Sequence, residues 1–293
     1  MNKSFKNLIL ISSFLVFFAL SYLIVLYAYG YQFDFKNLNW IKTGSLFIKT
    51  NLSDAKIHID GKLKGKTSFL LATFVEKYFL PGNYEVIIKK EEFSTLFKNI
   101  EIKSGEVSQL AHIYLIGTEE INDFIKNSEQ KEENTDYFIN KTDGLLYRSP
   151  KNGKTEKISS EPVYIKNYKL KILRENIYLA SSDSKAPGVF LLDSEGQWER
   201  LHLSPANDLI LSPDNKKMAI VAPNEINVLW LKNESESPYF KEGQKELILG
   251  TNEKIGQVFW FKTGWHLIYL TENNQIHFVE IDNTGGRNNL VIY

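Results

Sequence analysis

The first chemistry to consider is metal binding by histidine, because the chain has no cysteine. Neutral imidazoles bind zinc and other transition metals when the spacing brings them together, as in HxxxH or HExxH on a helix. The five histidines follow neither spacing; they are His58, His112, His202, His266 and His277. His58 and His277 lie in alternating, strand-like runs, where we expect them to face solvent. The sequence therefore predicts no metal site.

Catalytic motifs are also missing. Gly61-Lys-Leu-Lys-Gly-Lys-Thr superficially suggests a phosphate loop, but it lacks the GxxxxGK[ST] spacing and follows a hairpin strand. There is no GxSxG nucleophile elbow and no DxDxDG calcium loop. The acidic pairs Glu119-Glu120 and Glu132-Glu133 lie among polar residues and are interpreted as solvated charge. We predict no catalytic, cofactor-binding or metal-binding residue and no enzyme activity, and the sequence leaves the ligand-binding residues unknown.

Composition narrows the class of partner. The 35 basic and 35 acidic residues cancel, so no overall field would attract nucleic acid. The absence of cysteine excludes disulfides, thiolate ligands, a cysteine nucleophile and a lipoprotein-type anchor. The 293 residues allow two modest domains, and the aromatic fraction of 13% favours strands.

The N-terminal segment 1–30 is predicted to be a cytoplasmic tip followed by a transmembrane helix. Residues 8–29 carry no charge, and as a helix they would be about 33 Å long, enough for a hydrocarbon core. Lys3 and Lys6 precede this run, which predicts a cytoplasmic N-terminus and an extracytoplasmic C-terminal bulk. A cleaved signal peptide is the alternative, but the run is long and Tyr-Ala-Tyr-Gly is a poor cleavage site.

Residues 43–117 alternate between short strand-like runs and turn residues. Gly44-Ser-Leu-Phe-Ile, Lys56-Ile-His-Ile and Tyr84-Glu-Val-Ile-Ile are examples of the runs. Asp60-Gly61 is a hairpin turn signal, and Leu80-Pro-Gly-Asn is another turn. Five to seven strands predict a small antiparallel β-sandwich, with a short helix or bulge between Phe69 and Phe79.

Six pieces of this segment, in order, resemble the PEGA domain. They are Gly44-Ser-Leu, Asn51 to Ala55, Ile57-His-Ile-Asp-Gly-Lys, Gly65-Lys-Thr, Leu80-Pro-Gly-Asn-Tyr-Glu-Val and Lys103-Ser-Gly-Glu-Val. Leu52 stands where proline is usual, and Glu92-Phe93 replaces the usual Gly-Tyr. The resemblance implies an extracytoplasmic structural or binding module of bacterial and archaeal surface proteins, without catalytic residues.

Residues 118–134 are predicted to form a charged linker or exposed helix, because they are too polar to offset the entropy of ordering. Residues 135–293 then repeat. Leu211-Ser-Pro-Asp-Asn-Lys-Lys-Met-Ala-Ile-Val aligns with Trp260-Phe-Lys-Thr-Gly-Trp-His-Leu-Ile-Tyr-Leu, and a period of about 50 residues is typical of propeller blades. Ser212-Pro-Asp-Asn-Lys resembles the SPDGK turn of WD40-like and TolB-like repeats. About four blades are predicted, as a four-blade ring, an open array, a fragment, or a ring completed by association.

The predicted fold class is therefore mainly β: one transmembrane helix, a PEGA-like sandwich and propeller-like blades. We expect a membrane-anchored envelope protein that binds or scaffolds a protein partner. The alternative is binding to cell wall or surface glycan; a remote one is the regulatory ectodomain of a hydrolase or kinase. Four tryptophans discriminate between a protein partner and a glycan: Trp198, Trp230, Trp260 and Trp265. Their burial between blades would favour a protein partner, and their joint exposure would favour a glycan.

Overall fold

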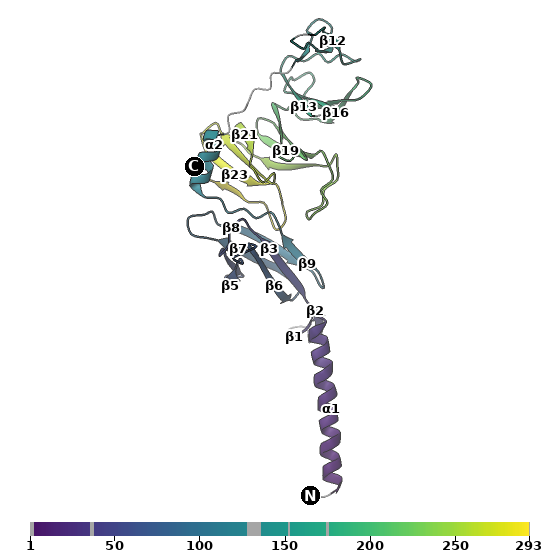
Figure 1. Cartoon of the computed structure of the whole chain (residues 1–293), viewed down its shortest axis with the longest axis vertical. Helices are drawn as coiled ribbons and strands as arrows, with labels where there is room; N and C mark the ends of the chain where they lie inside the picture. Colours follow the sequence, from purple (N-terminus) through teal and green to yellow (C-terminus); the bar gives the residue numbers. More distant parts are fainter. Residues whose placement is uncertain (1–2, 36–37, 128–135, 152, 174–175, 293) are drawn as a thin grey trace. The chain divides into compact units, whose positions relative to one another are not determined.

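The computed structural model describes residues 3–35, 38–127, 136–151, 153–173 and 176–292 (Figure 1). The chain divides into two compact units. The first comprises residues 1–117 with Asn283–Gly286, and the second comprises 118–282 with 287–293. The structure is mainly β, as predicted, and each unit is described by itself.

The first unit begins with α1, Lys3–Ala28, which contains the uncharged run almost entirely. The span Lys6–Ala28 has a mean hydropathy of 2.6 and is not buried in the protein, so it is long and apolar enough to cross a membrane. Two of its serines have satisfied hydroxyls: Ser12 and Ser13 donate to the carbonyls of Ile9 and Leu10. The helix is thus compatible with lipid on all sides.

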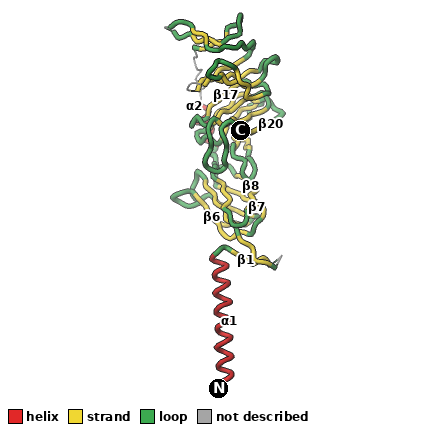
Figure 2. The backbone as a smooth tube through the Cα atoms, turned by 90° about the vertical axis from the view of Figure 1, so that its right-hand side faces the viewer, coloured by secondary structure: helices red, strands yellow, loops and turns green. Residues whose placement is uncertain are grey.

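A short hairpin follows α1 directly, formed by β1 (Tyr31–Asp34) and β2 (Asn39–Lys42). Gly30 leaves the helix with a positive φ of 82°, which glycine adopts without a Cβ clash. Both the backbone N–H and the hydroxyl of Thr43 donate to the Gly30 carbonyl, at 2.8 and 2.7 Å. These bonds close the hairpin at its base, and Figure 2 shows the hairpin projecting sideways from the end of α1.

The rest of the first unit is a β-sandwich of two sheets in the order β6-β3-β9 and β5-β4-β7-β8. The strands are β3 (Gly44–Lys49), β4 (Lys56–Ile59), β5 (Lys62–Lys66), β6 (Thr73–Phe79), β7 (Gly82–Lys89), β8 (Leu96–Ile102) and β9 (Val107–Leu110). Strand β8 alternates strictly between buried and exposed residues, as the predicted period of two requires. Its inward residues meet those of β3, β4 and β7 in a core that includes Leu46, Ile57 and Val86.

Two details refine the sequence prediction. Of the short helix or bulge expected between Phe69 and Phe79, the structure has the bulge: residues 73–79 form strand β6, paired with β3, and the register shifts at Tyr78, opposite Gly44 and Ser45. The sandwich is also not wholly antiparallel, since β9 pairs with β3 in parallel. The connection from β8 returns β9 to the other sheet, where it runs in the direction of β3.

The local signals of this unit have structural explanations. Asp60 and Gly61 both have positive φ, 47° and 73°, the conformation of a two-residue hairpin turn. The buried Thr67 hydroxyl accepts from the Ala55 N–H and donates to the Leu52 carbonyl. The glycine- and lysine-rich segment is therefore hairpin strand β5 followed by a threonine that secures a neighbouring turn, which agrees with the rejection of a phosphate loop.

The second unit contains α2 (Thr118–Asn127) and, in the described residues, four antiparallel sheets in which each strand pairs with the next along the chain. The first sheet has β10 (Tyr137–Ile139), β11 (Leu146–Arg148) and β12 (Glu156–Lys157). The second has β13 (Tyr168–Leu173), β14 (Asn176–Ser181), β15 (Gly188–Leu192) and β16 (Trp198–His202). The third has β17 (Asp208–Leu211), β18 (Lys217–Val221), β19 (Glu225–Trp230) and β20 (Lys245–Gly250). The fourth has β21 (Ile255–Trp260), β22 (His266–Thr271), β23 (Ile276–Glu280) and β24 (Asn289–Val291).

These sheets are the predicted blades, and the aligned repeat falls on equivalent elements. Leu211 and Trp260 each end the first strand of a sheet, and the second strand follows after one tight turn. In the Ser212-Pro-Asp-Asn-Lys turn, Asn215 has a φ of 54°, where related turns have glycine. The four sheets thus match the expected number of blades.

Of the two alternatives for residues 118–134, a charged linker or an exposed helix, the structure has a helix at the start, and one face of this helix is buried. Residues 118–127 are helical, and Ile121 is buried while Phe124 packs its ring against Phe259 and Phe261. Because Ile121 and Phe124 are three positions apart, they share one face of the helix and can bury it despite the polar composition. Residues 128–134, including Glu132-Glu133, lie outside the described residues.

Candidate binding pocket of the second unit

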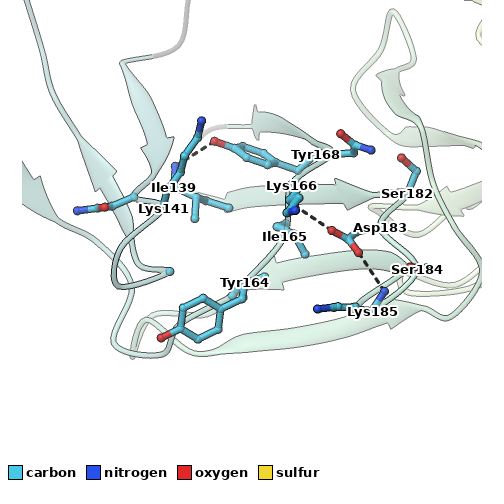
Figure 3. A pocket seen from close by; sticks show the side chains of 14 residues that line it. Ile139, Lys141, Tyr164, Ile165, Lys166, Tyr168, Ser182, Asp183, Ser184 and Lys185 are labelled. Carbon is cyan, nitrogen blue, oxygen red and sulfur yellow. Dashed lines mark hydrogen bonds between the residues drawn. The ribbon is translucent and has the colours of Figure 1, made fainter.

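A pocket of about 870 Å³ lies between the first and second sheets of the second unit (Figure 3). Three segments line it. They are the end of β10 with the turn that follows (Ile139, Asn140, Lys141, Gly144), the approach to β13 (163–168), and the turn after β14 (182–185). Each contributes polar side chains, so the pocket differs from the apolar cores on either side of it.

Strand pairing explains why two of these segments meet. Strands β13 and β14 are antiparallel, and Tyr168 at the start of β13 pairs with Ser181 at the end of β14. The residues before Tyr168 and after Ser181 must therefore leave the sheet at the same end. These two connections, one from each strand, line the pocket together.

The first sheet also lines the pocket, and hydrogen bonds attach it to the approach to β13. The Ile139 N–H donates to the Tyr168 hydroxyl at 3.1 Å, and the Val163 N–H donates to the Gly144 carbonyl at 2.7 Å. Gly144 has a φ of 71°, and a Cβ there would come within 2.9 Å of the Tyr164 ring. Glycine is thus required at this turn both by its backbone and by the close approach of that ring.

Asp183 organises the pocket backbone. Its two carboxylate oxygens each accept one bond at 3.0 Å, from the backbone N–H groups of Lys166 and Lys185 (Figure 3). These backbone bonds hold the pKa of Asp183 below its ordinary value, so the carboxylate stays ionised. Because it already bonds the two loops, we interpret Asp183 as a positioning residue of the pocket.

The ammonium groups around the pocket give it a positive character. Lys141, Lys166 and Lys185 are exposed, and with Asp183 they give the lining residues three cationic side chains and one carboxylate, a formal balance of +2. Tyr164 adds a ring that is 65% exposed. Lysine ammoniums supply three rotatable donors each, and an exposed tyrosine supplies apolar area with a polar tip. The arrangement can bind an anionic group beside an apolar one.

The tryptophans singled out from the sequence do not line this pocket. Trp230 and Trp260 are buried in a core shared by the third and fourth sheets, against which Trp265 packs. Trp198 packs, partly buried, in the core between the first and second sheets. The prediction that Trp230, Trp260 and Trp265 pack between blades is confirmed, and the four rings form no joint exposed groove.

The histidines are dispersed, but one prediction about them is wrong. His277 is 9% exposed rather than solvent-facing, because β23 lies between two other strands of its sheet. The imidazole ring of His277 stacks on the Tyr269 ring, with centroids 4.5 Å apart. Burial lowers the pKa of both His277 and His202. His58 is half-buried, and burial with Lys89 and Lys56 nearby lowers its pKa. Within the described residues, no group of three or more histidine or acidic side chains is placed to hold a metal ion.

Sequence reasoning did not find the pocket residues. Their signal is weak: Asn140-Lys-Thr-Asp-Gly and Ser182-Asp-Ser-Lys are polar turns of the kind that join most strands. Nothing in either turn indicates that it meets the other. That meeting depends on the packing of two sheets.

Comparison with known proteins supports the PEGA resemblance of the first unit. Residues 43–113 match the PEGA domain. Among solved structures, the crystal structure of Hsv2 from Kluyvelomyces marxianus, a β-propeller protein, matches over 72% of this chain and 73% of its own, with 12% identity and a TM-score of 0.27. So low a score carries no argument, and the propeller-like character rests on the four consecutive sheets. No curated protein matches the sequence.

Proposed function

We propose that this is a single-pass membrane protein whose extracytoplasmic part is a non-catalytic binding module for a protein partner. Three observations support the proposal: the lipid-compatible α1, the PEGA match next to it, and the positively charged pocket of the second unit. The pocket is the observation that carries the binding function. Its volume lies in the range of pockets that enclose a ligand group or a peptide side chain.

The orientation follows from charge. Lys3 and Lys6 precede the uncharged run, and lysines flanking a first helix favour the cytoplasmic side. The PEGA domain and the propeller-like sheets then lie outside the cytoplasm, in the cell envelope. The PEGA match is consistent with this side, because the family is of extracytoplasmic type.

A protein partner is favoured over wall glycan by the position of the aromatic rings. Sugar binding by stacking needs rings exposed along a groove, and the four tryptophans are packed in cores instead. The pocket has lysines and one exposed tyrosine, which suit acidic side chains of a protein. No observation favours the hydrolase or kinase ectodomain.

Site-specific photocrosslinking in intact cells tests the binding function. A benzoylphenylalanine replacing Tyr164 in the full chain is expected to give a discrete adduct that protease digests. The matched control is the same replacement at Tyr239, an exposed tyrosine of the same unit outside the pocket lining, which should give none. An adduct removed by muramidase would support the glycan alternative, and equal yields at both positions would rule out the pocket.

The absence of cysteine allows a direct test of orientation. Ser184→Cys should react with a membrane-impermeant maleimide in intact cells, whereas Lys6→Cys should react only after permeabilisation. The reverse pattern would overturn the proposed topology. Release of the chain as a shorter soluble form would support cleavage of the N-terminal segment instead.

A further inference from the structure

Aromatic side chains gather at the C-terminal end of α1 from three separate elements of the first unit. The helix end contributes Tyr27 and Tyr29, both exposed. The β1–β2 hairpin and the end of β6 contribute the others. We call this group the aromatic collar; it consists of Tyr27, Tyr29, Phe33, Phe35, Trp40 and Tyr78.

The hairpin presents an apolar surface that the protein itself leaves open. Phe33 lies opposite Trp40 in the register, with ring centroids 5.4 Å apart, and packs against Phe35 at 5.2 Å. Yet Phe35 is 83% and Trp40 41% exposed. In the described residues the hairpin pairs with no third strand, and an isolated two-stranded hairpin is at best marginally stable in water. Its exposed rings need a covering medium.

Tyr78 reaches the collar through an unfavourable backbone conformation. It has a φ of 67°, which for a bulky residue costs about 1–2 kcal/mol. Its ring stacks on that of Tyr27, with centroids 5.0 Å apart and planes inclined by 17°. The sandwich thus directs a ring from its own strand end to the last turn of the helix.

The aromatic collar adjoins the end of α1, which indicates what covers it. The hydrogen bonds from Thr43 to Gly30 hold the base of the hairpin two residues beyond the helix end at Ala28. If α1 crosses a bilayer, this end emerges at the headgroup region, where tyrosine and tryptophan are enriched because their rings are apolar and their tips polar. The collar has this composition.

We propose that the aromatic collar lies in the lipid headgroup interface and seats the first unit on the outer surface of the membrane that α1 spans. The proposal rests on the anchor proposed above. It goes further, because a transmembrane helix alone would leave the sandwich free to move at the end of a tether. Rings from the helix, the hairpin and β6 restrain it at three points.

Fluorescence quenching by brominated lipids tests the collar. The full chain is reconstituted in phosphatidylcholine vesicles brominated either near the headgroup or deep in the acyl chain. Trp40 is one of five tryptophans, so shallow bromines should quench up to about one fifth of the emission, and deep bromines less. Trp40→Phe should abolish the quenching, and Trp198→Phe, a tryptophan of the second unit, should leave the quenched component unchanged.

Two results would overturn the proposal, and they are distinguishable. If the chain floats with the vesicles but wild type and Trp40→Phe are quenched equally, the collar is wrong and the anchor remains. If the chain does not float with the vesicles at all, the anchor fails and the collar fails with it. Shallow quenching that depends on Trp40 supports both.

Discussion

The ammonium of Lys217 lies 4.4 Å from the centroid of the Trp265 ring and is fully buried. Lys217 begins β18 in the third sheet, and Trp265 belongs to the turn before β22 in the fourth. The same ammonium is 3.5 Å from the Asp214 carboxylate and 3.9 Å from that of Glu234. Burial lowers the pKa of Lys217, and the two carboxylates oppose that effect. A buried ammonium directly after the Ser212-Pro-Asp-Asn-Lys turn thus joins the third and fourth sheets.

Replacing Lys217 tests how much its buried ammonium contributes to the stability of the second unit. Lys217→Ala is expected to destabilise the second unit by about 2–5 kcal/mol, because it removes a fully buried side chain from the Trp265 ring and leaves Glu234 with Lys216 as its cationic partner. Lys217→Met combined with Glu234→Gln should lose less, because the pair is removed together and the stem still covers Trp265. Denaturant titration of the full chain in micelles, followed by tryptophan fluorescence, measures both. Lys232→Met, at an exposed lysine, is the control and should change little.

Trp260 and Trp230 form a matched pair for testing the packing between blades. The Trp260 indole N–H donates to the Ile210 carbonyl across the two sheets at 2.7 Å. The Trp230 indole N–H has no hydrogen-bond partner among the described residues. Trp260→Phe should therefore cost about 0.5–1.5 kcal/mol more than Trp230→Phe, the net contribution of the hydrogen bond to the Ile210 carbonyl. Equal losses in the same titration would show that the bond contributes nothing.

Stability of the second unit should fall on mild acidification. Burial lowers the pKa of His277 in the folded state, so the unfolded chain takes up a proton first as the pH drops below about 6.5. The stabilising contribution is complete above that pH and is lost as the pH falls through the folded-state pKa. His277→Phe keeps a ring against Tyr269 but cannot titrate. The free energy of unfolding should therefore fall less steeply between pH 6.5 and pH 5 in this variant than in the wild type. One histidine contributes at most about 1.4 kcal/mol per pH unit to that slope. An unchanged slope would show that another group causes the loss of stability in acid. His202, whose pKa is also lowered by burial, would be the next candidate.

Glu92 is a site where a substitution should stabilise the first unit. It has a φ of 67° at the position where the PEGA resemblance has glycine. Glu92→Gly should relieve the strain at some cost in unfolded-chain entropy, for a net gain of about 0.5–1 kcal/mol. Hydrogen exchange of β7 and β8 peptides in the full chain should slow. The neighbouring Glu91→Gly, without a positive φ to relieve, should quicken it; slowing in both would contradict the explanation.

Much of the fold follows from local pattern. The uncharged run determines a helix that lipid can surround, since no stripe of polar residues needs water. The period of two places strands, and Asp60-Gly61 and Ser212-Pro-Asp-Asn-Lys mark turns whose backbone only a few residue types adopt readily. The repeat of about 50 residues then indicates successive equivalent sheets. Each of these signals is contained within one element or its immediate flanks.

Tertiary structure alone decided which surfaces meet. His277 has the alternating neighbours of an exposed strand residue, but both faces of β23 are covered. The pocket exists because the turn after β10 packs on connections from β13 and β14, and Tyr78 joins the collar only because β6 ends beside the helix. Contacts of this kind depend on the stacking of elements far apart in the chain. A residue's own neighbours determine the direction of its side chain, whereas what that side chain meets depends on the free energy of the whole packed unit.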